Sequence, residues 1–264
     1  MLTAVKNQAK ISFLSIKYAL VREMLNKVSF ISSIFFMILN NASFIIQWFI
    51  LFSIKDNICG YQIKDILILW GLASGTFGVS HFFFKKSYSL SNVINTGQLD
   101  NHLVQPKNVL LSCITTDVDT SALGDILYAY IMLFIVKRSI LWFLEYTLLI
   151  ICGGIIITCV AVLTGSLAFW LKKSDMIADR INSFSTNFAT YPDGIFKGVT
   201  KLILYTIIPV GFANYLPLKT MLHFNPVVIA VVVSYTIFMT SFAFFVFYKG
   251  IRRYSSTNLM NARI

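Results

Sequence analysis

Acidic residues are scarce in this sequence. The 264 residues include only 11 Asp and Glu against 22 Lys and Arg, and charged residues make up 12% of the chain. A soluble domain usually carries about twice that share. Hydrophobic residues reach 57% and the mean hydropathy is +0.74. This composition excludes an ordinary soluble domain and predicts a protein that crosses a membrane several times.

The sequence also lacks common motifs of nucleotide-binding proteins, hydrolases and metal sites. It contains no GxxxxGK[ST] phosphate loop and no G-x-S-x-G nucleophile motif, so neither ATP binding through that loop nor serine hydrolysis is expected. The three histidines stand far apart, and the four cysteines show no metal-ligand spacing. We therefore expect no catalytic residue, no metal and no cofactor in this chain. The histidines are His81, His102 and His223, and the cysteines are Cys59, Cys113, Cys152 and Cys159.

Long apolar runs predict the membrane spans, because a transmembrane helix needs about 20 mostly apolar residues. A more polar run, Asp175–Tyr191, is expected to be the fifth of six spans. Residues 192–225 are interrupted by prolines, and we expect short re-entrant helices there that enter the outer leaflet without crossing. The other five predicted spans are Val28–Phe52, Ile66–Phe84, Ser121–Val136, Trp142–Leu171 and Pro226–Tyr248.

The distribution of basic residues predicts the orientation. With both termini cytoplasmic, the cytoplasmic segments hold 15 of the 22 Lys and Arg residues. This bias agrees with the positive-inside rule, and the positive charge is then expected to face anionic lipid rather than nucleic acid. The chain reads as one transmembrane domain over residues 1–264, and its N-terminal segment has no small-residue cleavage site.

Residues 1–27 precede the first span and are expected to contain a helix on the inner membrane surface. The helix is predicted over Ile11–Lys27, because polar residues cluster on one arc while the rest is apolar. The arc comprises Ser12, Ser15, Ala19, Arg22, Glu23 and Asn26.

Small residues recur along two of the spans. Gly71, Gly75 and Gly78 lie on one face of the second span. The fourth span has a longer stripe, Gly154, Thr158, Ala161, Gly165 and Ala168. Such stripes allow the backbone of another helix to approach closely, either within the chain or from a second subunit.

Three aspartates mark the start of the third span. Asp117 and Asp125 would share one helical face with Ser121 and Gly124. Acidic residues inside a membrane are functional candidates, so this face is one candidate for contact with a proton, a cation or a substrate. The alternative is that Asp117 and Asp119 remain at the cytoplasmic rim.

Four stretches, taken together, resemble the membrane permeases of type-2 ABC exporters. The first is Gly97-Gln98-Leu99-Asp100, followed by Leu103 and Pro106-Lys107-Asn108-Val109-Leu110, which matches a signature of a small bacterial branch. The others are SLAFWLKKSD (166–175), YPDGIF (191–196) and IPVGFANYLP (208–217). Their order and spacing cover nearly the whole chain.

The resemblance implies a fold and a set of partners. It implies an all-α membrane protein with six spans, a cytoplasmic coupling helix within residues 85–106, and re-entrant helices between spans five and six. It also implies a homo- or heterodimer of permeases in the bacterial cytoplasmic membrane, working with separate subunits that bind ATP and Mg²⁺. The coupling residues would be Leu90, Val93, Ile94, Gly97, Leu99, Asp100, Leu103 and Pro106, and translocation or packing would involve Asp117, Asp125, Tyr191, Pro192, Pro209, Tyr215 and Pro217.

Local features fit a coupling helix in the loop. Ser89 is expected near the N-cap, Gly97 at the left-handed stop, and Pro106 in the first turn of the next helix. Gln98 and Gln105 stand where the family often has charged residues, which favours contact by shape and hydrogen bonding over ion pairs. An ordinary surface loop is the alternative.

Two other function classes stay open at this point. A proton-coupled secondary transporter or channel would use Asp117 and Asp125. A membrane partner that transports nothing itself, such as an immunity or sensory subunit, would need no ATP turnover in its complex.

Overall fold

The computed structural model describes residues 2–171 and 174–255, with the side chains of residues 2–5 outside the description. Lys172, Lys173 and Arg263, which belong to the predicted cytoplasmic charges, therefore lie outside the described residues. The helices are α1 (Leu2–Met24), α2 (Lys27–Ile54), α3 (Ile63–Phe84), η1 (Lys85–Ser89), α4 (Leu90–Asn95), α5 (Asp100–Leu103), α6 (Val109–Ile114), α7 (Ala122–Val136), α8 (Ile140–Ser166), η2 (Leu167–Phe169), α9 (Asp175–Ala189), η3 (Asp193–Ile195), α10 (Gly198–Thr206), η4 (Gly211–Tyr215), α11 (Leu216–Leu222) and α12 (Pro226–Ile251).

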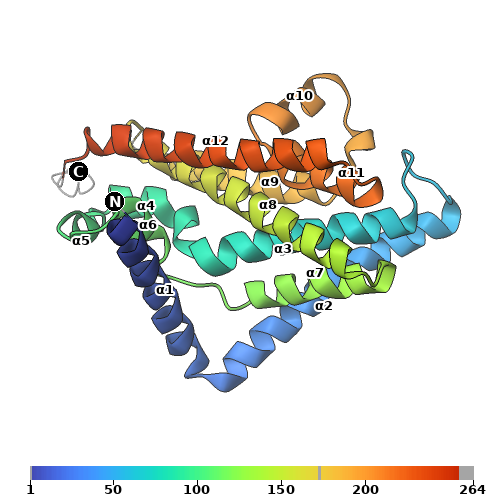
Figure 1. Ribbon diagram of the computed structural model, residues 1–264, viewed down its shortest axis with the longest axis horizontal. Coiled ribbons are helices and arrows are strands. Elements are labelled where there is room, and N and C mark those ends of the chain that lie inside the picture. Colours follow the sequence, from blue (N-terminus) through green and yellow to red (C-terminus); the bar gives the residue numbers. More distant parts are fainter. Residues whose placement is uncertain (1, 172–173, 256–264) are drawn as a thin grey trace.

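The described chain is an all-helical bundle, with no β-strand between residues 2 and 255 outside the two masked positions. The long helices run side by side, and α4, α5 and α6 gather at one end of the bundle (Figure 1). The start of α1 and the end of α12 lie at that same end, while α10 and α11 lie near the other end. The described chain therefore begins and ends at the same end of the bundle, and the side of the membrane that this end faces stays a prediction.

Four described helical segments are long and apolar enough to cross a membrane. The helices α7 and α9 have 15 residues each, or about 22 Å of helix at 1.5 Å per residue. That is shorter than a hydrocarbon core of about 30 Å, so the predicted six-span arrangement is not confirmed by length and composition. The four segments are Lys27–Ile54, Ile63–Asn95, Ile140–Phe169 and Pro226–Ile251.

The region expected to be re-entrant is sharply bent. Gly198–Thr206 and Gly211–Leu222 meet at 82°, a geometry that suits either a broken span or a re-entrant loop. Pro209 lies at the break, where it cannot donate the backbone hydrogen bond that would continue a helix. Pro217 lies in the first turn of α11, where that donor is not needed.

The predicted surface helix was too short. The helix α1 begins at Leu2, nine residues before the expected start at Ile11, because the apolar and polar pattern of residues 2–10 also suits a helix. It diverges from the bundle and meets α2 at a bend (Figure 1). Ala19, on the predicted polar arc, is buried, whereas Phe13 and Tyr18 are exposed. The part of the arc around Ser12, Ser15 and Ala19 thus faces the protein, whereas Arg22, Glu23 and Asn26 are exposed.

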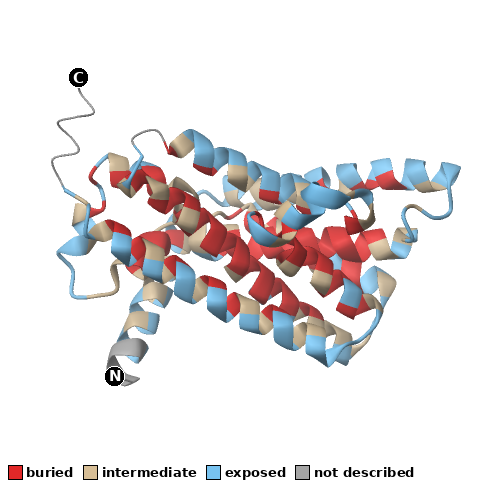
Figure 2. Cartoon of the chain, turned by 90° about the horizontal axis from the view of Figure 1, so that it is seen from above, coloured by how far each residue is buried: buried red, intermediate tan, exposed pale blue. Residues whose placement is uncertain are grey.

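The helix α3 lies at the centre of the bundle, and its side chains are buried on all sides (Figure 2). Its glycines allow this. A Cβ on Gly78 would lie 3.0 Å from the Ala122 carbonyl oxygen of α7. A Cβ on Gly154 of α8 would lie 2.8 Å from the Val79 Cβ of α3. Both predicted small-residue stripes therefore pack within the chain, where close backbone approach stabilises the helix contacts.

We predict that Gly78→Val destabilises the protein, because its side chain would press on the backbone of α7. Overpacking of this kind usually costs about 1–3 kcal/mol, so the midpoint of thermal unfolding in detergent should fall. Ala230→Leu adds the same number of carbon atoms at an exposed position of α12 and should leave the midpoint unchanged. Equal midpoints for Gly78→Val and the parent protein would contradict this account of the packing.

Candidate functional site

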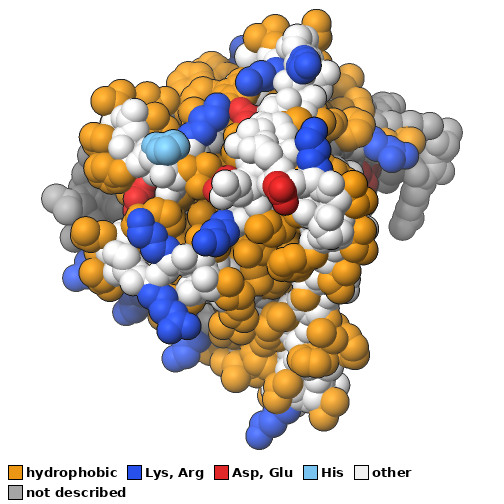
Figure 3. Space-filling view, turned by 90° about the vertical axis from the view of Figure 1, so that its right-hand side faces the viewer, with side chains coloured by type: hydrophobic (Ala, Val, Ile, Leu, Met, Phe, Trp, Pro, Cys, Tyr) orange, Lys and Arg blue, Asp and Glu red, His pale blue; other side chains and the backbone are white. Residues whose placement is uncertain are grey.

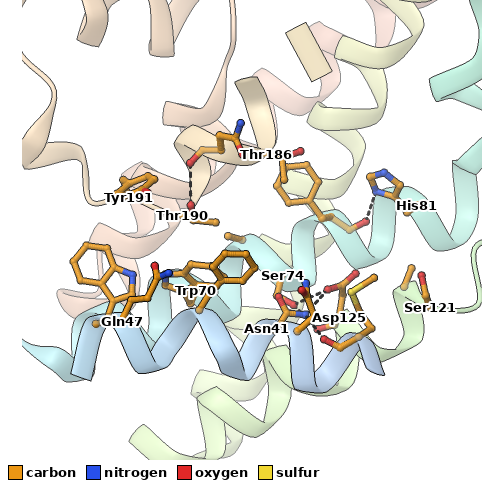
Figure 4. A pocket seen from close by; sticks show the side chains of 18 of the residues that line it. Asn41, Gln47, Trp70, Ser74, His81, Ser121, Asp125, Thr186, Thr190 and Tyr191 are labelled. Carbon is orange, nitrogen blue, oxygen red and sulfur yellow. Dashed lines mark hydrogen bonds between the residues drawn. The ribbon is translucent and has the colours of Figure 1, made fainter. Parts of the chain in front are cut away.

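A cavity of 680 Å³ lies among α2, α3, α7, the α6–α7 connection and the end of α9 (Figure 4). Its lining combines aromatic, amide, hydroxyl and carboxylate side chains. The lining residues are Met37, Asn40, Asn41, Phe44, Gln47, Trp48, Leu51, Trp70, Ala73, Ser74, Phe77, His81, Asp119, Ser121, Ala122, Asp125, Thr186, Asn187, Thr190 and Tyr191.

Two polar side chains, one from α2 and one from α3, meet the carboxylate of Asp125 in the first turn of α7. Asn41 Nδ2 of α2 donates to Asp125 Oδ1 over 2.6 Å. Ser74 Oγ of α3 lies 2.9 Å from the Asp125 carbonyl oxygen and 3.3 Å from Oδ1. Figure 4 shows these side chains converging on the carboxylate. Two neutral donors thus hold the carboxyl group at the junction of α2, α3 and α7.

Aromatic rings form another part of the cavity wall. Phe44 of α2 stacks on Trp70 of α3, with ring centroids 5.4 Å apart. Trp48 of α2 meets Tyr191, just beyond α9, edge to face at 6.1 Å. The indole Nε1 of Trp70 is buried and has no hydrogen-bond partner among the described residues. The cavity wall therefore combines aromatic side chains with a carboxylate.

Asp119 and His81 line the cavity near the α6–α7 connection. Asp119 Oδ1 accepts from the Ser121 backbone N–H at 3.1 Å and from Ser121 Oγ at 2.7 Å, and its Oδ2 lies 3.8 Å from Lys85 Nζ. His81 Nδ1 donates to the Phe77 carbonyl oxygen at 3.1 Å. Both groups are thus held by neighbours on or next to their own helix.

The predicted helical face shared by Asp117 and Asp125 was wrong, because the helix is broken between α6 and α7. The Asp117 carboxylate accepts from the Val118 N–H at 3.1 Å, and Asp119 similarly caps Ser121. Such local hydrogen bonds compete with helix formation. Asp117 instead pairs with Arg22 of α1 at 2.9 Å and is partly exposed, while its predicted position at the cytoplasmic rim stays a prediction.

The loop between α3 and α6 turns its predicted coupling residues inward. The Leu90, Val93, Ile94 and Leu99 side chains are buried and belong to the hydrophobic cluster between this loop, α8 and α12. Leu90 packs directly over Gly165 of α8. These side chains therefore anchor the loop and are not available to a partner.

The fully exposed residues of the loop are uncharged, but charged side chains lie beside them: Lys85 and Lys86 are half-buried, and the Lys85 side chain is 44% exposed. The exposed residues combine amide and hydroxyl side chains with apolar ones, and Val104 has 83% of its surface exposed. Asp100 is half-buried and Lys107 is half-buried. We define the exposed loop surface as Asn92, Thr96, Gln98, Asn101, Leu103, Val104, Gln105 and Pro106.

The backbone around α4 follows the prediction. Gly97 has φ +75°, so it ends α4 in the left-handed conformation that glycine adopts easily. Ser89 occupies the N-cap position of α4, although its hydroxyl makes no capping hydrogen bond and donates to the Lys86 carbonyl oxygen at 3.3 Å. The expected place of Pro106 in the next helix was wrong, since α6 begins at Val109 with Asn108 as its side-chain cap.

A family model described as ABC-2 family transporter protein matches residues 36–258. The chain belongs to the ABC-2 family of transporter proteins. No curated protein matches it, and no solved structure matches it. Membership identifies the chain as the membrane component of an ABC transporter, a multi-pass permease subunit of a family that works with ATP-binding subunits.

In the structure of this ABC-2 protein, only some of the residues predicted to act in translocation or packing line the cavity. Asp125 and Tyr191 line the cavity. Tyr215 donates to the Phe188 carbonyl oxygen over 2.6 Å and ties η4 to α9. Asp117 pairs with Arg22 and does not line the cavity. The remaining residues, Pro192, Pro209 and Pro217, are buried in the packing beside the cavity-forming helices and do not line the cavity.

The sequence analysis missed several cavity residues of the ABC-2 protein. Asn40 and Asn41 are adjacent amides within the long apolar run of α2, and Gln47 follows two turns later. Polar side chains inside a membrane span cost free energy and are functional candidates, so these three residues could have been predicted as site residues from the sequence. Ser74 and Trp70 could not, because both residue types are common in packed membrane helices.

A second polar cluster joins the ABC-2 protein's bent region to the α2–α3 connection, at the end shown in Figure 3. Buried Asp193 accepts from the Tyr61 hydroxyl at 2.5 Å and lies 3.0 Å from Lys219 Nζ and 3.7 Å from Lys201 Nζ. Burial alone would raise the pKa of Asp193. The hydrogen bonds from Tyr61 and Lys219 and the two ammonium charges outweigh it and lower the pKa.

We predict that Asp193→Asn lowers the stability at neutral pH by roughly 2–3 kcal/mol, since it removes a buried charge with its hydrogen bonds. A lowered pKa means that the stabilisation is complete above the ordinary carboxyl pKa of about 3.9. It is lost as the pH falls through the lower pKa of the folded state. Thermal unfolding of parent and variant in detergent, between pH 7 and pH 3, checks this.

Asp56→Asn serves as the control for that experiment, because Asp56 is exposed in the same α2–α3 connection. It should leave unfolding unchanged at every pH. If Asp193→Asn behaves like Asp56→Asn at pH 7, or if its effect grows on acidification, the cluster does not stabilise the fold as described.

Proposed function

We propose that this ABC-2 protein is the membrane-spanning subunit of an ATP-driven exporter. It would act as a homo- or heterodimer in a bacterial cytoplasmic membrane, with ATP and Mg²⁺ bound by separate partner subunits. The chain would have six spans, α2, α3, α7, α8, α9 and α12, and both termini in the cytoplasm. The single observation that carries the proposal is the cavity, which lies among the first, second, third and fifth of these spans.

The surroundings of the cavity support a transport path. Its lining reaches from Asp119, near the end with α4–α6, to Tyr191, beyond the far end of α9. The cavity is therefore elongated along the bundle. A transported molecule needs such a passage with contacts on several helices, and ligand sites in bundles occur between helices in this way.

The exposed loop surface supports a docking site for the ATP-binding subunit. It lies at the end of the bundle that the basic residues assign to the cytoplasm. Its buried anchors on α8 make it rigid, and its exposed residues are amides, a threonine and the apolar Leu103, Val104 and Pro106. Contact there would depend on shape and hydrogen bonds, as interface cores do.

A physical connection runs from this loop to the cavity. Asn95 Nδ2, at the end of α4, donates to Asp175 Oδ1 at 3.3 Å, at the first residue of α9. The other end of α9 and the turn after it supply Thr186, Asn187 and Tyr191 to the cavity wall. A push on the loop would thus tilt α9 and change the cavity, which couples ATP-driven closure of the partners to transport.

We predict that Val104→Asp abolishes docking of the ATP-binding subunit, because it places a charge in the centre of the exposed loop surface. In complexes purified from cells that express both subunits, co-purification and ATP turnover should each fall at least tenfold. Val104→Leu keeps the apolar surface and should keep both. The elution profile of each variant in size-exclusion chromatography reports whether the permease is folded.

Full association and ATP turnover with Val104→Asp would contradict the docking surface. Transport that survives depletion of ATP and stops with Asp125→Asn would favour the proton-coupled alternative. A complex without any ATP turnover would favour the non-transporting alternative.

A further inference from the structure

The cavity has a charge opposite to that of the chain. The chain carries 22 Lys and Arg against 11 Asp and Glu, yet the described residues that line the cavity include Asp119 and Asp125 and no Lys or Arg. A path for an anion would be expected to draw on the abundant basic residues. The lining of this cavity selects instead for positive charge.

The two carboxylates differ in how their charge is balanced. Asp119 lies 3.8 Å from Lys85. Asp125 forms no ion pair with any described basic residue, and its side chain receives only the neutral donors Asn41 and Ser74. Hydrogen bonds from neutral groups stabilise a buried carboxylate without cancelling its charge. A cation bound in the cavity would supply the missing counter-charge.

The aromatic wall suits an organic cation. Trp70 and Phe44 stack beside the carboxylate, and Phe77 lines the same cavity. Aromatic faces attract cations and also bury apolar groups. Trp70 is only 7% exposed and its indole N–H is buried, so this residue would contribute aromatic surface and not a hydrogen bond.

The size of the cavity excludes a bare metal ion as its natural occupant. A volume of 680 Å³ lies within the 300–1,000 Å³ that hold drug-sized ligands. Within the described part of the chain, no group of three or more His, Cys, Asp or Glu side chains could hold a metal ion. The occupant therefore needs an apolar body as well as a charge.

We propose that this cavity binds amphipathic organic cations, with the positive group near Asp125 and the apolar body against Trp70, Phe44 and Phe77. This inference names the substrate class of the proposed exporter and rests on the proposed role of the cavity. The binding itself requires no ATP and no partner subunit.

Tetraphenylphosphonium and tetraphenylborate provide the test, since they have nearly the same shape and opposite charge. Binding to the full-length protein in lipid nanodiscs would be followed by saturable quenching of tryptophan fluorescence, with empty nanodiscs as the blank. Of the four tryptophans, Trp142 and Trp170 lie outside the cavity. The changes Trp142→Phe and Trp170→Phe therefore leave only Trp48 and Trp70, which report on the cavity.

The cation should bind at least tenfold more tightly than the anion, because a tenfold ratio needs only about 1.4 kcal/mol of charge interaction. Asp125→Asn keeps the shape of the side chain and should weaken tetraphenylphosphonium binding about tenfold without weakening tetraphenylborate binding. Asp56→Asn removes an exposed carboxylate outside the cavity and should leave both affinities unchanged.

Equal affinity for the two ions in the parent protein would overturn the inference, whether or not the Asp125 variant folds. An unchanged preference in a folded Asp125→Asn protein would overturn it as well. These results are independent of docking by an ATP-binding subunit. Cation binding by a chain that never associates with an ATPase would preserve the inference and refute the proposed exporter.

Discussion

The close packing of α3 against α7 and α8 is the constraint on which the remaining structure depends. Gly71, Gly75 and Gly78 leave no room for a Cβ on the faces that meet α7 and α8, and Gly153 and Gly154 of α8 approach α3 equally closely. Dense interiors of this kind are not continuously deformable. The three helices therefore form a rigid core, and movement must occur around it.

The cavity lies at the edge of that core. One side is α3 with the start of α7, and the other side is α2 with the end of α9. The first half of α2 packs closely on α7, since a Cβ on Gly124 would meet the Ile34 carbonyl oxygen and the Met37 side chain. From Ala42 to Ile54, most side chains of α2 are exposed, and α9 is held through Asn95 at one end and Tyr215 near the other. Helices with few packing contacts open at low free energy. The fold thus places a movable wall next to a fixed one, with Asp125 at their junction.

The sequence predicts most of the helices and part of the site. Composition determines the membrane class, and the spacing of Gly71, Gly75 and Gly78 predicts the tight packing of α3, because small residues matter there by themselves. Side-chain direction in the loop was less predictable. Leu90 and Leu99 are apolar in a polar segment and turn inward, whereas Asp117 leaves the helix through its own backbone hydrogen bonds. The pairing of Asn41 with Asp125 depends on how α2 crosses α7, which no local pattern specifies.

The distance between Gln47 on α2 and Asn187 on α9 tests the central claim most directly. Both residues are exposed and line the cavity, so spin labels can be attached to cysteines there after Cys59→Ser. Pulsed electron paramagnetic resonance would measure the distance between the two labels in the ATP-trapped and nucleotide-free complex. Labelled chains would be diluted with unlabelled ones, so that only distances within one chain are recorded. The account predicts a change in this distance and a constant distance between labels at Leu127 of α7 and Leu148 of α8. A constant distance across the cavity, or a change within the core, would contradict it.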